Sequence, residues 1–178
     1  LEARLVQRLG SGSVVKLRSR EQIPVGGGIS IRALFTPGHE DDHVSYFLRA
    51  DRVLFSGDTI LGHSSATVRN LKQYMPTLEL MARQRPDIIC PGHGPLIRNG
   101  TQRVQWYIEH RQQREEQVLA ALASGAQTVD DLVREIYPKN LRRNLREAAA
   151  RNVRTHLAKL KEEKRVGEQV ATYTLNTG

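Results

Sequence analysis

Alternation of apolar and polar residues along the first half of the chain predicts short β-strands. Each segment ends at a turn signal, and Gly26-Gly27-Gly28 is expected to be a flexible turn between the first two strands. The segments that carry this pattern are 14–18, 29–35, 44–48, 53–55 and 87–90. A sheet of short strands is therefore expected in this half.

Residues 67–85 repeat apolar side chains every three or four positions, which is typical of an amphipathic helix. Pro76 falls inside this segment, so we expect a kink or a short first helix that ends there. Strands with an intervening helix indicate a mixed α/β layer whose chemistry lies at the ends of its strands.

The pattern changes near Thr101, where three helices and a hairpin are predicted. Gly125 ends the first helix, and Thr128 with Asp131 forms a capping box that begins the second. The segments are 101–124, 129–137, a helix from 141 or 145 to 163, and a hairpin over 165–174. This order is that of a winged helix, so we expect an α/β domain over 1–100 and a long helix with a winged-helix-like domain over 101–178.

Composition narrows the class of partner. The 178 residues are 39% hydrophobic and 26% charged, with a net charge of +8 and a pI near 10.1, which favours an anionic partner. No apolar run reaches the roughly 18–20 residues of a membrane span, and the single Cys90 excludes an intrachain disulfide. The chain opens on Leu1 within a helix-like segment, residues 1–9, so we expect it to be the interior of a longer polypeptide.

Three predicted strands end in a glycine turn followed by a metal-capable side chain. They are Thr36-Pro37-Gly38-His39, Ser56-Gly57-Asp58 and Pro91-Gly92-His93-Gly94. Imidazoles and a carboxylate are the ligands of hydrolytic zinc sites, and a carboxylate can bridge two ions. One such histidine alone is more often a hydrogen-bonded structural residue, but three at successive strand ends indicate a metal site.

These motifs resemble the third, fourth and fifth metal motifs of metallo-β-lactamase-fold hydrolases. Their order and spacing along the chain agree with those of the family. The resemblance is narrowed to endoribonucleases of this family by the longer motifs around His39 and His93, by residues 107–111 and by the predicted winged-helix-like domain. The resemblance implies the C-terminal part of an αββα fold. It also implies that His39 binds one zinc ion, that His93 binds the other, and that Asp58 bridges them as the catalytic carboxylate.

One family motif, His-x-His-x-Asp-His, occurs nowhere in the sequence. It supplies most of the remaining ligands, and we expect it upstream of Leu1, with the first sheet. Three protein ligands plus a water are usual for a catalytic zinc, whereas this chain offers two for each ion. We therefore expect the chain alone to be inactive, and one or two zinc ions in the complete protein.

Two residues near His39 are weaker candidates. His43 could orient a ligand or contact substrate, and it could equally be a histidine that packs within its loop. Asp42 could hold the tautomer of an imidazole or could belong only to the turn. We expect both residues to support the metal ligands or to contact the substrate.

The predicted last helix is strongly basic. A cationic helix beside a hairpin can bind phosphates, although a run of charge is more often only a solvated face. The residues expected to bind nucleic acid are Arg142, Arg143, Arg146, Arg151, Arg154, Lys159 and Lys161. We favour phosphate contact because the substrate implied by the resemblance is itself a polyanion.

These observations together predict a zinc-dependent hydrolase that cleaves phosphodiesters in single-stranded RNA. The alternatives are a thioester hydrolase similar to glyoxalase II, which the basic tail disfavours, and a non-catalytic nucleic-acid-binding module. We expect no membrane association and an intracellular location, in the mitochondrial matrix by family resemblance or otherwise in the cytoplasm. A homo-oligomer is compatible with the sequence.

Overall fold

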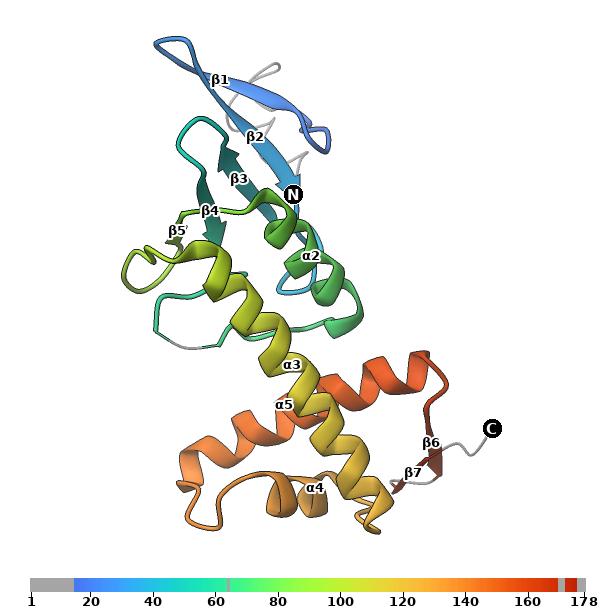
Figure 1. The fold of residues 1–178 in the computed structure, drawn as a ribbon. Coiled ribbons are helices and arrows are strands. Elements are labelled where there is room, and N and C mark those ends of the chain that lie inside the picture. Colours follow the sequence, from blue (N-terminus) through green and yellow to red (C-terminus); the bar gives the residue numbers. More distant parts are fainter. Residues whose placement is uncertain (1–14, 64, 170–171, 176–178) are drawn as a thin grey trace, which may run out of the picture.

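A computed structural model describes residues 15–63, 65–169 and 172–175 of the chain. The helix-like segment expected at residues 1–9 lies outside these ranges. Figure 1 shows a sheet with helices on one face, followed by a bundle of helices and a small hairpin. Helix α3 runs from the sheet to the bundle and joins the two parts.

Five strands form the first sheet, in the spatial order β1-β2-β3-β4-β5. They are β1 (Gln22–Gly26), β2 (Ile29–Phe35), β3 (Val44–Leu48), β4 (Val53–Gly57) and β5 (Ile88–Pro91). Neighbouring strands are antiparallel except β4 and β5, which are parallel because helix α2 (Leu71–Gln84) connects them. Strands β2, β4 and β5 therefore point in the same direction.

The prediction of a strand at 14–18 was wrong. Residues 15–18 are not in a strand, and the partner of β2 is β1, which begins four residues later. The tight glycine turn decides this register, because it pairs Gln22 with Arg32 and Ile23 with Ile31. Continued in that register, residues 15–18 would lie beyond the end of β2, where Pro37 and Gly38 turn the chain away.

Helices α2 and α3 (Gly100–Ala123) cover one face of the sheet. Their buried side chains pack on the inward residues of the strands. Examples are Leu34 of β2, Leu54 of β4, Ile89 of β5, Leu78 of α2 and Tyr107 of α3. Helix α2 begins later than predicted, because the Asn70 side chain accepts a hydrogen bond from Gln73 N at 3.1 Å and caps it. Pro76 stays inside this single helix instead of ending a first one.

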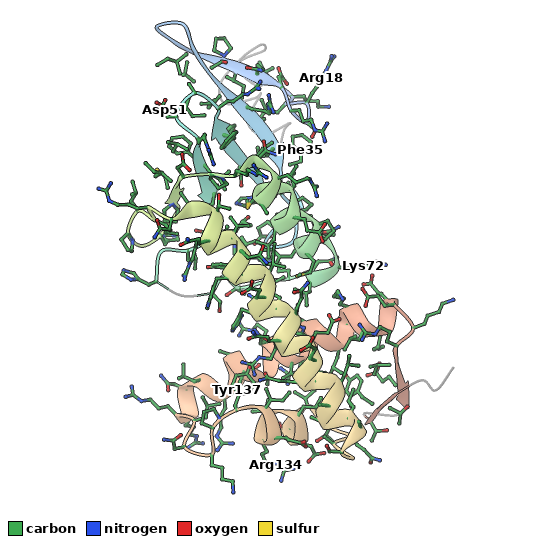
Figure 2. All side chains as sticks on the ribbon, in the orientation of Figure 1. Arg18, Phe35, Asp51, Lys72, Arg134 and Tyr137 are labelled. Carbon is green, nitrogen blue, oxygen red and sulfur yellow. The ribbon has the colours of Figure 1, made fainter. Side chains whose placement is uncertain are left out.

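The opposite face of the sheet is apolar as well. The strand registers place Phe35 beside Val44, and Phe55 between Tyr46 and Cys90, on this face. Phe35 and Phe55 keep 42% and 41% of their surface exposed, and Figure 2 shows Phe35 at the end of β2. A sheet face of this composition is a packing surface, not a solvated one.

The second part of the chain has the predicted helix, helix, helix, hairpin order. Helix α3 is followed by α4 (Val129–Ile136), α5 (Arg143–Glu162), β6 (Val166–Gln169) and β7 (Thr172–Leu175). The Thr128 side chain accepts from Asp131 N at 3.1 Å while Asp131 Oδ2 accepts from Thr128 N at 3.0 Å, which confirms the capping box.

A separate apolar core holds this second part together. It is built from residues of α3, α4 and α5, among them Val118, Leu132, Val153 and Leu157. Leu145 is 46% exposed, because it lies in the first turn of α5, beyond the packed core. None of the helices in the described ranges is long and apolar enough to cross a bilayer.

Candidate metal centre

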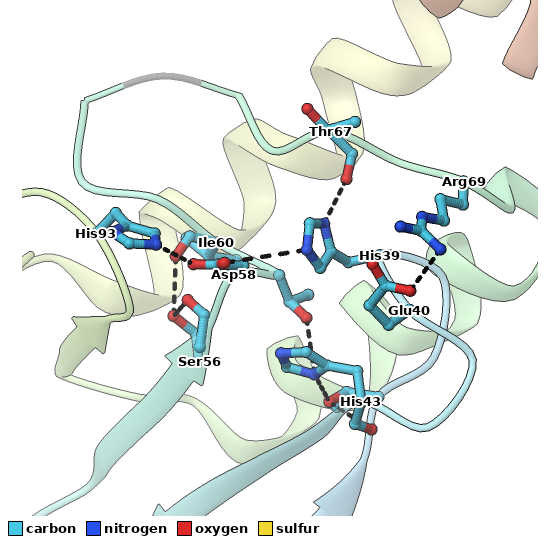
Figure 3. Close-up of polar contacts among 12 residues, drawn as sticks. His39, Glu40, His43, Ser56, Asp58, Ile60, Thr67, Arg69 and His93 are labelled. Atoms are coloured by element: carbon cyan, nitrogen blue, oxygen red, sulfur yellow. Dashed lines mark hydrogen bonds and ion pairs between the residues drawn. The ribbon is translucent and has the colours of Figure 1, made fainter. Parts of the chain in front are cut away.

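The three predicted metal motifs meet at one edge of the sheet. Because β2, β4 and β5 point the same way, the loops that follow them leave the sheet together and carry His39, Asp58 and His93. The carboxylate lies between the two imidazoles (Figure 3): His39 Nε2 is 4.0 Å from Asp58 Oδ2, and His93 Nε2 is 3.5 Å from Asp58 Oδ1. Each oxygen of Asp58 thus faces a different histidine.

The hydrogen bond of His39 determines which ring nitrogen is free to bind a cation. Its Nδ1 lies 2.7 Å from the backbone carbonyl oxygen of Thr67, which can only accept, so Nδ1 carries the proton. In the neutral ring this leaves the lone pair on Nε2, the nitrogen that faces Asp58. A carbonyl that fixes the tautomer in this way is a regular partner of metal-binding histidines.

Asp58 supplies a second sign that the side chains fit a cation. Its Oδ1 is buried and has no hydrogen-bond partner among the described residues, although a buried carboxylate oxygen normally has one. A divalent cation between Asp58 Oδ1 and His93 Nε2 would satisfy that oxygen. In the described part of the chain no three His, Cys, Asp or Glu side chains enclose a single ion, so the arrangement amounts to two partial sites that share Asp58.

Glycine is needed where the loops cross. A Cβ on Gly92 would lie 2.6 Å from Asp58 Oδ1, and one on Gly57 would lie 2.6 Å from His43 Nε2. Gly57 also has a φ of +52°, which disfavours other residues. Gly57 and Gly92, which directly precede Asp58 and His93 in the sequence, therefore make room for the site itself.

Comparison with known families agrees with this geometry. Residues 11–93 match the Metallo-beta-lactamase superfamily, and residues 128–171 match the Beta-lactamase associated winged helix domain. The chain belongs to the metallo-beta-lactamase superfamily. The predicted fold class and the winged-helix tail are confirmed.

Individual relatives place the chain within this superfamily. It is 40% identical over 139 residues to the Beta-lactamase-like protein 2 homolog of Drosophila melanogaster, covering 76% of this chain and 47% of the relative. It is 39% identical over 122 residues to the Atrochrysone carboxyl ACP thioesterase of Aspergillus fumigatus, covering 62% and 39%. The crystal structure of a metallo-beta-lactamase family protein from Thermus thermophilus superposes with a TM-score of 0.73 at 28% identity, covering 91% and 54%. The chain thus spans less than half of these two curated relatives.

Within the metallo-beta-lactamase domain, His43 lies behind the metal-facing residues. Its Nδ1 is 2.8 Å from Thr36 Oγ1 and 3.2 Å from Thr59 Oγ1, and its ring meets that of His39 edge-on at 6.2 Å. Burial lowers the pKa of His43, and the neighbouring His39 lowers it further, so the fold favours the neutral form of the ring. His43 therefore supports the His39 loop, while Asp42 lies exposed in the turn before β3.

Two tyrosines fix the segment that carries Asp58, and the sequence pattern did not reveal this role. Tyr74 of α2 donates its hydroxyl to the Thr59 carbonyl at 2.5 Å, and Tyr107 of α3 accepts from Leu61 N at 2.9 Å. Both rings are fully buried. Helical spacing identifies Tyr107 as a core residue, but the partner of its hydroxyl follows only from the tertiary structure.

The seven basic residues expected to bind nucleic acid fall into two groups. The five arginines are exposed on α5 or just before it, and Arg154 pairs with Glu147 at 3.1 Å. Lys159 lies 2.7 Å from Glu115 and 2.9 Å from Glu163, with only 13% of its side chain exposed. Lys161 pairs with Glu168. Lys159 thus joins α5 to α3 and presents no free ammonium group to an anionic ligand.

Proposed function

We propose that the chain is the C-terminal part of a zinc-dependent hydrolase that cleaves phosphodiesters in single-stranded RNA. The observation that carries this proposal is the carboxylate of Asp58 between His39 and His93 at the edge of the sheet. A zinc ion bound there would supply a water of lowered pKa and an electrophile for the phosphoryl oxygen. The exposed arginines of α5 support a polyanionic substrate.

The residues of this chain have separate parts in the proposed reaction. His39 presents Nε2 because Thr67 holds its other nitrogen, and His43 keeps the loop in place. Asp58, whose two oxygens face different imidazoles, would hold the zinc together with His39 and His93 and balance its positive charge. The remaining ligands would come from the family motif that this sequence lacks.

A thioester hydrolase is the second candidate. The relative in Aspergillus fumigatus is named as an acyl carrier protein thioesterase and is nearly as similar to this chain as the Drosophila protein is. We call the edge of the sheet that carries His39, Asp58 and His93 the metal edge. A metal ion bound there could also polarise a thioester carbonyl. The exposed arginines favour RNA over this alternative, since RNA carries a phosphate at every nucleotide.

The test is to assay the full-length protein, loaded with zinc, on single-stranded RNA, on a glutathione thioester and on an acyl carrier protein thioester. We expect cleavage of RNA, lost on chelation and reduced more than about 100-fold in Asp58→Asn, because the centre then lacks its shared ligand. Asp51→Asn, an exposed residue of the turn after β3, is the matched control and should keep full activity. Thioester turnover without RNA cleavage would overturn the proposal.

A further inference from the structure

A cavity of about 150 Å³ lies beside the metal edge, between the segment 65–68, helix α3 and helix α5. Its volume is several times the roughly 30 Å³ that one water molecule takes in the liquid, so it can hold a group the size of phosphate. The residues around it include Thr67, Arg111, Arg151, Asn152 and Thr155. None of the described residues that line it is an aspartate or a glutamate.

Arg111 is the buried charge of this cavity. The residue is 3% exposed, its Nη2 donates to the Ala66 carbonyl at 2.7 Å, and its Nε is buried without a hydrogen-bond partner. No carboxylate of the described chain forms an ion pair with it. Burial lowers the pKa of Arg111, which means that its present surroundings disfavour the charged guanidinium. A buried charge without a counter-charge is costly, and an anion in the cavity would offset that cost.

Three other side chains complete a donor set suited to phosphate. Arg151 is exposed at the mouth of the cavity and forms no ion pair with the described residues, so its guanidinium is available. The Thr155 hydroxyl donates to the Arg151 carbonyl at 2.9 Å and can rotate toward an anion, and the amide of Asn152, whose Oδ1 has no partner, can turn its NH₂ group toward the same anion. Two guanidinium groups with neutral donors are a common way for proteins to bind phosphate oxygens.

Thr67 connects the cavity to the metal edge. Its carbonyl accepts from His39 Nδ1 at 2.7 Å, and Figure 3 shows Asp58 at one ring nitrogen of His39 and Thr67 at the other. The cavity and the metal edge therefore share Thr67, and a chain of phosphodiesters has groups enough to occupy both. An isolated small substrate would occupy only one of these positions.

We propose that this cavity is a phosphate subsite, in which Arg111 and Arg151 bind a non-scissile phosphate of single-stranded RNA next to the metal centre. The proposal rests on the proposed RNA cleavage for the identity of the ligand, while phosphate binding in the cavity does not require any hydrolysis. Arg111 binds the anion from inside and Arg151 closes over it from the surface.

Binding of inorganic phosphate to the chelator-treated protein, followed by titration calorimetry, tests the site without a contribution from metal. The parent should bind phosphate saturably, and Arg151→Gln should weaken binding about 5- to 10-fold through loss of a charge-assisted hydrogen bond. Arg49→Gln removes the same charge from the exposed turn between β3 and β4, away from the cavity and outside the basic residues expected to bind nucleic acid, and should bind as the parent does. Arg111→Met should abolish saturable binding, with circular dichroism to check that the variant is folded.

A second arm identifies the source of the phosphate. A single-stranded oligouridylate should displace inorganic phosphate from the parent, and Arg151→Gln should weaken binding of that oligonucleotide more than Arg49→Gln does. Equal phosphate binding by parent and Arg151→Gln would overturn the subsite even if the loaded enzyme cleaves RNA. Displacement by a phosphopantetheine-bearing carrier protein, but not by the oligonucleotide, would overturn the assignment to RNA while leaving an anion site in place.

Discussion

Gly92 packs directly against the carboxylate of Asp58. A Cβ at position 92 would lie 2.6 Å from Asp58 Oδ1 and 3.1 Å from the backbone carbonyl carbon of Gly57, so no side chain fits there unless the carboxylate moves. The Pro-Gly-His turn that presents His93 is therefore also the surface against which Asp58 is positioned. The positions of Asp58 and His93 therefore both depend on Gly92.

Replacing Gly92 with alanine is expected to weaken metal binding about 10- to 100-fold, the usual effect of disturbing the residues behind a ligand. Competition with a chromogenic chelator measures this affinity. Gly28→Ala is the control: position 28 has a φ of +76° and open space around it, so alanine there strains the backbone far from the metal edge. Unchanged metal affinity in Gly92→Ala would show that Asp58 is not a ligand.

Tyr107→Phe is expected to lower the free energy of unfolding by about 1–2 kcal/mol, because the Leu61 N–H loses its acceptor at 2.9 Å. Urea unfolding measures the change. Tyr137→Phe is the matched control, since no hydrogen bond to its hydroxyl occurs among the described residues, and it should cost less. Equal effects of the two substitutions would contradict a role of Tyr107 in holding the segment after Asp58.

His156 is expected to make the protein less stable at acidic pH. Both of its ring nitrogens are buried without a partner, and burial, aided by the charges of Arg111 and Arg114, lowers its pKa from 6.5 to about 3. The unfolded chain therefore binds a proton that the folded chain excludes, so stability falls as pH drops below 6.5. The loss from this residue is about 2 kcal/mol between pH 6.5 and pH 5.

His156→Leu isolates this contribution, because leucine fills the site without a titratable group. Urea unfolding of parent and variant at both pH values gives the difference, in which the titration of the carboxylates cancels. We expect the variant to lose about 2 kcal/mol less than the parent on acidification. Parallel losses would mean that the imidazole titrates normally in the fold.

Thr128→Ala is expected to destabilise the winged-helix part by about 1 kcal/mol, since it removes the side-chain half of the capping box of α4. Thermal unfolding followed by circular dichroism detects the change. Ser124→Ala removes an exposed hydroxyl that donates to the Ala120 carbonyl at 3.0 Å, and should have a smaller effect. A larger effect of Ser124→Ala would contradict the assignment of Thr128 as the cap.

The features of this fold that depend on neighbouring residues could be predicted from the sequence, whereas those that depend on tertiary contacts could not. Each Gly-His or Gly-Asp turn is fixed by residues within a few positions, and so is the capping box at Thr128, so the pattern located them. The register of β1 depends on a hairpin pairing, which propensity at residues 14–18 could not reveal. Pairing of Lys159 with Glu115 joins residues 44 positions apart, and only the packed helices bring them together.

The same difference between local and tertiary features applies to the candidate metal centre and the cavity beside it. The directions of β2, β4 and β5 place His39, Asp58 and His93 at one edge, as the repeated motif implied. Arg111 lay within a segment recognised by resemblance, yet its burial and its orphaned Nε follow from the contact of α3 with the 65–68 segment. A charged residue in a helix gives no sign in the sequence of whether it faces water or an interior cavity.

Helix α3 has a geometric consequence for the whole molecule. Val104 belongs to the core under the sheet and Val118 to the core of the winged-helix part, and one unbroken helix of 24 residues contains both. Adding or removing one residue between them would turn the second part by about 100° around the helix axis and move it about 1.5 Å along it. The number of residues between the two cores therefore determines where the arginines of α5 lie relative to the metal edge.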